Sequence, residues 1–152
     1  MPDDDVTRRR AEVLGLRPEL AAAHERLLAT IWAGPVSPVT LELSRLRMAT
    51  LLSSTAALAE RSPAAVAAGL TEERIGRLPR WPSDPSFSAE ERACLGFVEQ
   101  FLIDHSQISD DDVRQLTDLL TAQGVVTFTT ALIAWDNQHR LDNALHVAPA
   151  RG

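Results

Sequence analysis

The chain contains no lysine, no tyrosine and only one cysteine, Cys94. Because lysine is absent, a protein Schiff base is excluded, and the 15 basic residues are all arginines. The absence of lysine indicates guanidinium pairing wherever an anion is held. The lack of tyrosine removes the phenol as an acid or nucleophile. A single sulfur cannot form an intramolecular disulfide, so dithiol chemistry within one chain is excluded as well.

Long apolar runs are also missing. No run reaches the roughly 18 residues that a membrane-spanning helix needs, and the first residues, MPDDDVTRRRAEV, lack the apolar stretch of a signal peptide. We therefore expect a cytoplasmic protein with no membrane partner. The net charge of −6 and the pI near 5.1 argue against a nucleic-acid partner.

Metal and cofactor motifs are absent too. The four histidines are scattered, without the spacing that places two ligands on one face of a helix. We expect neither a metal nor a cofactor. At 152 residues, with 45% hydrophobic and 24% charged residues, the chain has the size and composition of one globular domain.

Helix-start signals divide the chain into a series of helices, and no segment reads as a convincing strand. Proline or a capping hydroxyl opens most of them, and Ser88 with Glu91 forms a capping box. Glycine closes several. The predicted helices are 18–33, 38–59, 62–69, 71–78, one that begins at 88, 109–124 and 126–145.

Apolar residues recur at helical spacing within these segments and predict the buried faces. The last helix is apolar on nearly all sides until Trp135, which predicts burial on more than one side and hence self-association. Buried faces are predicted at Leu20, His24, Leu27 and Ile31, and at Leu116, Leu119 and Leu120.

The pattern predicts an all-α bundle with three parts. Residues 1–16 form a partly disordered arm, in which Arg8 to Arg10 follow three aspartates and are solvated. Residues 17–147 form the helical domain, and residues 148–152 form a tail.

The segment LELSRLRMATLLSSTAALAERSPAAVAAGL, from Leu41 to Leu70, resembles the carboxymuconolactone decarboxylase and AhpD-like alkylhydroperoxidase superfamily. In the peroxidase branch of that superfamily, a helical Glu is followed twelve residues later by Cys-x-x-Cys-x-x-x-His. The glutamate position is Glu42 here. The cysteine positions are Ser54 and Ala57, and the histidine position is Arg61.

The resemblance extends from about Arg17 to Val147. It implies an AhpD-like helical bundle that assembles as a trimer or hexamer, with sites close to the subunit contacts. Peroxide reduction needs one thiolate to attack and a second thiol to resolve the sulfenic acid, and neither a serine nor an alanine can do either. We therefore expect no peroxidase activity of the usual kind.

Glu42 and His139 are the candidate catalytic residues. Glu42 is either a surface carboxylate that pairs with Arg45 or a proton carrier that faces a pocket. His139 and Arg140 either face a cavity, where one transfers protons and the other holds a carboxylate, or belong to a surface on which Asp136 and Arg140 pair.

The candidate substrate-binding residues are Ser54, Arg61, Arg140 and His24. Ser54 is either a ligand-binding hydroxyl at the former thiol position or a helix hydroxyl that bonds to the backbone. His24 lies on an apolar stripe, where a hydrogen-bonded core histidine is the alternative to a ligand contact.

Three functional hypotheses follow. The first is a thiol-independent acid–base enzyme, a decarboxylase or lactone-processing enzyme, that acts on a small carboxylate. The second is a non-catalytic scaffold that binds a small molecule or a protein partner. The third and least favoured is peroxidase activity sustained by Cys94 with an external thiol.

Overall fold

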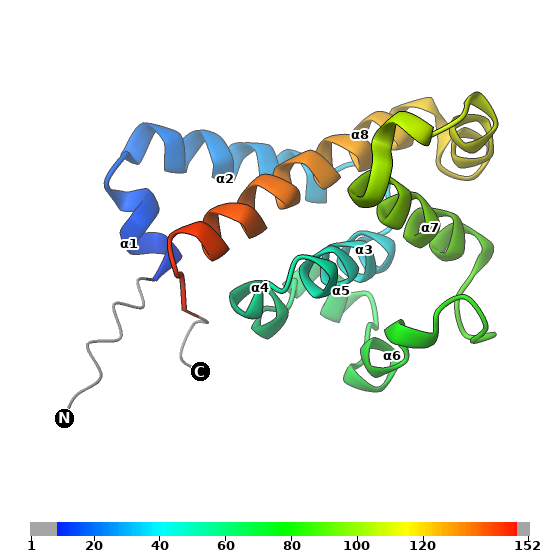
Figure 1. Ribbon diagram of the computed structural model, residues 1–152, viewed down its shortest axis with the longest axis horizontal. Helices are drawn as coiled ribbons and strands as arrows, with labels where there is room; N and C mark the ends of the chain where they lie inside the picture. Colours follow the sequence, from blue (N-terminus) through cyan, green and yellow to red (C-terminus); the bar gives the residue numbers. More distant parts are fainter. Residues whose placement is uncertain (1–8, 149–152) are drawn as a thin grey trace.

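The computed structural model describes residues 9–148 (Figure 1). No β-strand lies in this part of the chain, so the predicted all-α class is confirmed. The helices are α1 (Arg10–Gly15), α2 (Pro18–Trp32), α3 (Pro38–Leu51), α4 (Thr55–Ala59), α5 (Pro63–Ala67), α6 (Glu72–Gly76), η1 (Leu78–Arg80), α7 (Ala89–Asp104), η2 (His105–Gln107) and α8 (Asp110–Ala144).

The helix starts follow the signals in the sequence. Proline occupies the first turn of α2, α3 and α5, where its missing N–H group has no helical partner to lose. The side chains of Ser88 and Ser109 each accept from a backbone N–H group in the first turn, and both form the predicted type of reciprocal capping box.

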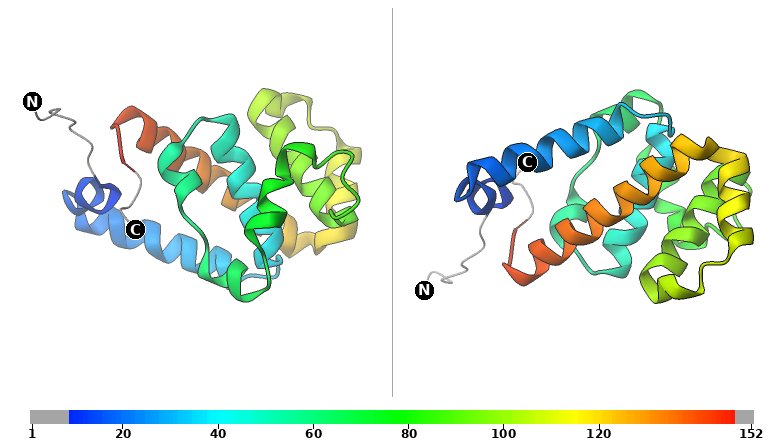
Figure 2. Two further views of the ribbon diagram at one scale, coloured as in Figure 1. Left: turned by 90° about the horizontal axis from the view of Figure 1, so that it is seen from below. Right: turned by 90° about the horizontal axis from the view of Figure 1, so that it is seen from above.

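Helix α3 forms the centre of the molecule. It packs against α7 on one side and α8 on the other, and α2 lies along the second half of α8 (Figures 1 and 2). The rings of Trp32 and Trp135 meet between α2 and α8 with their centroids 6.0 Å apart. Nine residues of α3 are buried, including the charged Glu42 and Arg45. The core helix therefore carries an ion pair into the interior.

Helix α3 ends at Leu51 rather than continuing to Ala59 as predicted. Ser53 adopts a left-handed backbone conformation with φ of 54°, and the N–H of Ser54 donates to the carbonyl of Ala49 at 2.9 Å. Ser54 then caps the separate helix α4. The small and hydroxyl residues here favour turns and caps, which explains why the chain leaves the helix.

The predicted break at Gly124 is wrong, because α8 continues through this residue. The interruption lies instead at Thr121, with φ of 69° and ψ of 168°. Gly124 is a packing residue, since a Cβ there would lie 2.9 Å from the Cβ of Leu120. By length and composition alone α8 could cross a membrane, but Phe128, Leu132 and other residues on its inner face belong to the core of the bundle.

Three predicted core positions are exposed: Leu20 at 56%, Leu27 at 39% and Leu119 at 37%. On α2, only Ile31 is buried, because α2 lies at the periphery of the bundle, where its main partner is the second half of α8. On α8, Val126 and Ile133 are also exposed. One chain therefore leaves part of its apolar surface uncovered.

The N-terminal arm is helical where the structure describes it. Residues 10–15 form α1, which packs against α2, and Arg10 is partly buried in ion pairs rather than fully solvated. Arg8 lies outside the described residues, as does all of the predicted tail except Ala148.

Candidate functional site

Glu42 and Arg45 form a buried ion pair on α3. Both oxygens of Glu42 accept from the guanidinium, with Nε to Oε2 and Nη2 to Oε1 each at 2.8 Å. The exposed fractions of the two residues are 0% and 6%. The surface interpretation of Glu42 is wrong, although its predicted pairing with Arg45 is present.

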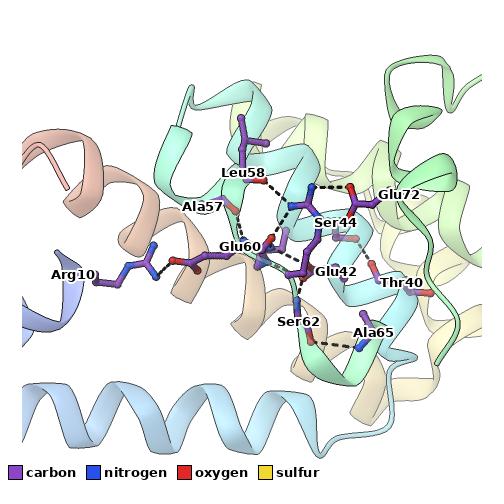
Figure 3. Close-up of polar contacts among 12 residues, drawn as sticks. Arg10, Thr40, Glu42, Ser44, Ala57, Leu58, Glu60, Ser62, Ala65 and Glu72 are labelled. Carbon is purple, nitrogen blue, oxygen red and sulfur yellow. Dashed lines mark hydrogen bonds and ion pairs between the residues drawn. The ribbon is translucent and has the colours of Figure 1, made fainter. Parts of the chain in front are cut away.

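The ion pair also holds the segment that carries the family's redox positions. Arg45 donates to the carbonyls of Ala57 and Glu60, each at 2.9 Å, and the N–H of Ser62 donates to Glu42 Oε1 at 2.9 Å (Figure 3). All the polar partners of Glu42 are donors, so its carboxyl group acts only as an acceptor, as an ionised carboxylate does. Glu42 is thus an anchor for residues 57–62.

Ser54 and Ala57 lie side by side at the start of α4 and are fully buried. The Oγ of Ser54 accepts from the N–H of Ala57 at 3.4 Å, so the hydroxyl acts as a helix cap. The hydroxyl of Ser54 and the methyl group of Ala57 thus occupy the positions at which a peroxidase needs two thiols. Neither group can exchange electrons with a peroxide.

Arg61, at the family's histidine position, faces Glu72 at the protein surface. Its Nε and Nη2 donate to the two oxygens of Glu72 at 2.7 and 3.0 Å, while Nη1 donates to the carbonyls of Leu58 and Glu60. The hydrogen bond with Glu72 raises the pKa of Arg61 above its ordinary value. A permanently charged guanidinium cannot transfer the proton that a histidine could.

His139 is fully buried on α8. No described residue meets hydrogen-bond geometry at either ring nitrogen. Desolvation lowers the pKa of His139 to about 4, the charge of Arg45 adds to the shift, and Asp142 opposes it. The imidazole is therefore neutral near pH 7 and retains an unused donor and an unused acceptor.

Arg10 connects α1 to two other parts of the chain. Its Nη1 donates to Glu60 Oε1 at 2.7 Å (Figure 3). Its Nε and Nη2 donate to the carboxylate of Asp142 at 3.0 and 2.5 Å. Gln138 satisfies both of its neighbours when its nitrogen donates to His24 Nε2 and its oxygen accepts from Arg10, each within 3.2 Å. His24 is thus the last group in a series of polar contacts that runs from Asp142 through Arg10 and Gln138.

These groups border an open cavity of about 720 Å³, which we call the arginine cleft. Arg9, Arg10, Arg45 and Arg61 supply its cationic lining, and Glu25 and Glu60 supply its acidic lining. Trp32, which is partly exposed and contacts the buried Trp135, supplies an aromatic surface. It lies among α1, α2, the turn before α5 and the second half of α8. A cleft of this size and composition suits a small apolar ligand that carries a negative group.

The predicted site residues divide into two groups in space. His24 and Arg61 line the arginine cleft, whereas Glu42, Ser54 and His139 lie behind its surface and are fully buried. Arg140 does not face the cleft, because its side chain is 62% exposed and Nε pairs with Asp136 at 2.9 Å. The surface alternative for Arg140 is therefore correct.

Sequence reasoning did not identify Arg10, Glu60, Gln138 or Asp142. Gln138 and Asp142 are four residues apart on α8, so a polar face on an otherwise apolar helix was a signal for them. Arg10 had no such signal, because its partner Asp142 is 132 positions away. Within residues 9–148, no group of three or more potential ligand residues could hold a metal ion.

The helical bundle, with a buried glutamate behind the segment from Ser54 to Arg61, defines the AhpD-like class of proteins. Residues 18–100 match the carboxymuconolactone decarboxylase family, and the chain belongs to that family. No curated protein matches the chain.

Solved structures share this AhpD-like helical fold. One is a protein of unknown function from Agrobacterium tumefaciens, described as a putative antioxidant defence protein AhpD. It has a TM-score of 0.81 and 20% identity over 95% of this chain and 100% of that one. Another is the debrominase Bmp8, as a cysteine-to-alanine variant in complex with 2,3,4-tribromopyrrole. Its TM-score is 0.73, with 12% identity over 90% of this chain and 74% of that one.

Proposed function

We propose that this chain is a thiol-independent member of its family that binds a small apolar carboxylate in the arginine cleft. The observation that carries the proposal is the cleft itself. Four guanidinium groups and the side chain of Trp32 border one cavity, while the family's thiol positions hold Ser54 and Ala57. Apolar walls with a few charged groups are typical of small-molecule sites.

Peroxidase chemistry has little support. Cys94 is fully buried, and desolvation raises the pKa of its thiol far above the physiological range, so the nucleophilic thiolate is scarce. We expect hydroperoxide turnover with an external thiol to be no higher in the wild type than in Cys94→Ala.

Acid–base catalysis by Glu42 also has little support, because its two oxygens are held by Arg45 and the N–H of Ser62. His139 favours acid–base catalysis as a second candidate function. It is a neutral imidazole near pH 7, and no described residue uses its nitrogens. A rearrangement that brought a substrate to this ring would find a general base.

Aromatic ligands are compatible with the fold, since the debrominase Bmp8 was solved with a brominated pyrrole. In the present chain the partly exposed Trp32 lines the cleft and supplies a surface on which an aromatic ring can pack. We therefore propose aromatic and unsaturated carboxylates as the first ligand class to test.

Ligand-observed NMR with a panel of aromatic carboxylates and lactones tests the proposal. We expect binding to the wild type and loss of binding in Ala64→Trp, because Ala64 lines the cleft and the indole would fill it. Ala68→Trp is the matched control, on an exposed residue of the same region that is not part of the lining. Binding that Ala64→Trp leaves unchanged would place the ligand elsewhere.

The same samples distinguish binding from catalysis. Mass spectrometry of each incubated ligand detects loss of carbon dioxide or opening of a lactone ring. Turnover that His139→Gln abolishes would favour the acid–base candidate, whereas a bound and unchanged ligand favours the binding scaffold.

A further inference from the structure

We propose that Arg10 is the carboxylate anchor of the arginine cleft and that Glu60 competes with the ligand for the same part of its guanidinium. The inference rests on the proposed binding function, and it adds a specific residue, a specific competitor and a charge requirement. It also assigns a ligand contact to α1, which lies before the part of the chain that matches the family.

The cleft has three other arginines. Arg9 is exposed at the N-cap of α1, whereas Arg45 and Arg61 are committed to structural roles. Arg45 donates to buried Glu42 and to the carbonyls of Ala57 and Glu60. Arg61 donates to both oxygens of Glu72 and to two carbonyls. Replacing any of these backbone acceptors by a ligand would leave a carbonyl group without its donor, which is unfavourable.

Arg10 differs because its two carboxylate partners have unequal exposure. The Asp142 side chain is 1% exposed and holds the Nε and Nη2 edge, whereas Glu60 is 36% exposed and holds only Nη1. A carboxylate that leaves Arg10 for water loses little when it is already solvated. Glu60 is therefore the exchangeable partner, and Asp142 keeps the guanidinium in place.

Gln138 further fixes the guanidinium. With its nitrogen toward His24, its oxygen accepts from Nη1 and Nη2 of Arg10 at 3.1 and 3.2 Å. None of the six residues of α1 is buried, so the helix can adjust its position at small energetic cost when a ligand enters. A ligand carboxylate that displaces Glu60 can then accept from the Nη1 group that Glu60 leaves.

Benzoate and its neutral analogue benzamide are the probes, because they share size and ring and differ in charge. We expect the wild type to bind benzoate more tightly than benzamide. In Arg10→Gln, benzoate binding should weaken on the order of tenfold while benzamide binding stays the same, since only the charged bond is lost. In Glu60→Gln, benzoate binding should strengthen severalfold because the competing charge is removed.

Arg140→Gln is the control, as it removes an exposed guanidinium outside the cleft and should change neither affinity. Failure of both probes to bind the wild type would overturn the proposed function together with this inference. If both probes bind and Arg10→Gln keeps the preference for benzoate, the anchor is overturned and the binding function stands. Glu60→Gln keeps Arg10 intact, so weaker benzoate binding in that folded variant would overturn the competition by itself.

Discussion

At the scale of single residues, Glu42 is the clearest case of a position whose role has changed. The resemblance implied a proton carrier, and the structure shows a carboxylate that bonds to Arg45 and to the N–H of Ser62. Its side chain links α3 to the segment before α5.

Replacing Glu42 by Gln should strongly destabilise the protein. The substitution leaves Arg45 as a buried charge without its partner, and breaking such pairs costs about 3–5 kcal/mol. Urea unfolding of Glu42→Gln measures the loss. Glu73→Gln is the control, because Glu73 pairs with Arg77 at the surface and its side chain is 79% exposed. Equal losses in the free energy of unfolding of the two variants would contradict a structural role for Glu42.

His139 should make the stability of the fold depend on pH. Its pKa is about 4 in the folded protein against an ordinary value of 6.5, so the unfolded chain binds the proton more tightly. Stability therefore falls as the pH falls from about 6.5 toward 4, by on the order of 2 kcal/mol between pH 7 and pH 5.

Urea unfolding of His139→Leu at pH 7 and pH 5 tests this dependence. The variant lacks the titrating ring, so we expect a smaller difference between the two pH values than in the wild type. His105→Gln, at an exposed position, should keep the wild-type difference. A wild-type dependence that survives in His139→Leu would assign it to other groups.

At the scale of the elements, the helix starts were predictable because their signals are local. Proline in the first turn and the hydroxyls of Ser88 and Ser109 act within three or four residues of themselves. The break after α3 and the interruption at Thr121 were not, since both place a non-glycine residue, Ser53 or Thr121, at a positive φ, and no glycine marks either position in the sequence. For the site, spacing identified Glu42, but the pairing of Arg10 with Asp142 joins residues too far apart to be predicted from periodicity.

Thr121 provides a test of the interruption in α8. Its φ of 69° and ψ of 168° lie in a region that glycine occupies far more readily than other residues. In a regular helix Gly is less stable than Ala by about 1 kcal/mol, whereas here Thr121→Gly should be more stable than Thr121→Ala. Thermal unfolding of the two variants measures the order. Both lack the hydroxyl that accepts from the N–H of Gly124, so the comparison isolates the backbone term.

At the scale of the whole molecule, one chain leaves apolar side chains uncovered on α2 and α8. Leu20 is 56% exposed, Val126 is 68% exposed and Ile133 is 51% exposed. Scattered exposed apolar residues are ordinary, but a second chain packed on the outer faces of these helices would bury them.

We expect the protein to self-associate as a trimer or hexamer, the states that the resemblance implies. Light scattering at micromolar concentration measures the mass. Ile133→Glu places a charge on the outer face of α8 and should lower the mass if this face is part of the interface. A monomer mass in the wild type would contradict the expectation.

The attachment of α1 has a consequence for local opening of the fold. Because α1 has no buried residue and Arg10 links it to Asp142 and Glu60, the helix can detach when these few bonds break, while the core around α3 stays intact. Its amide hydrogens should then exchange with solvent through an opening that is independent of global unfolding. A ligand that binds Arg10 favours the attached state of α1, so it should slow the exchange of amides in a wall of the cleft that can open without the core.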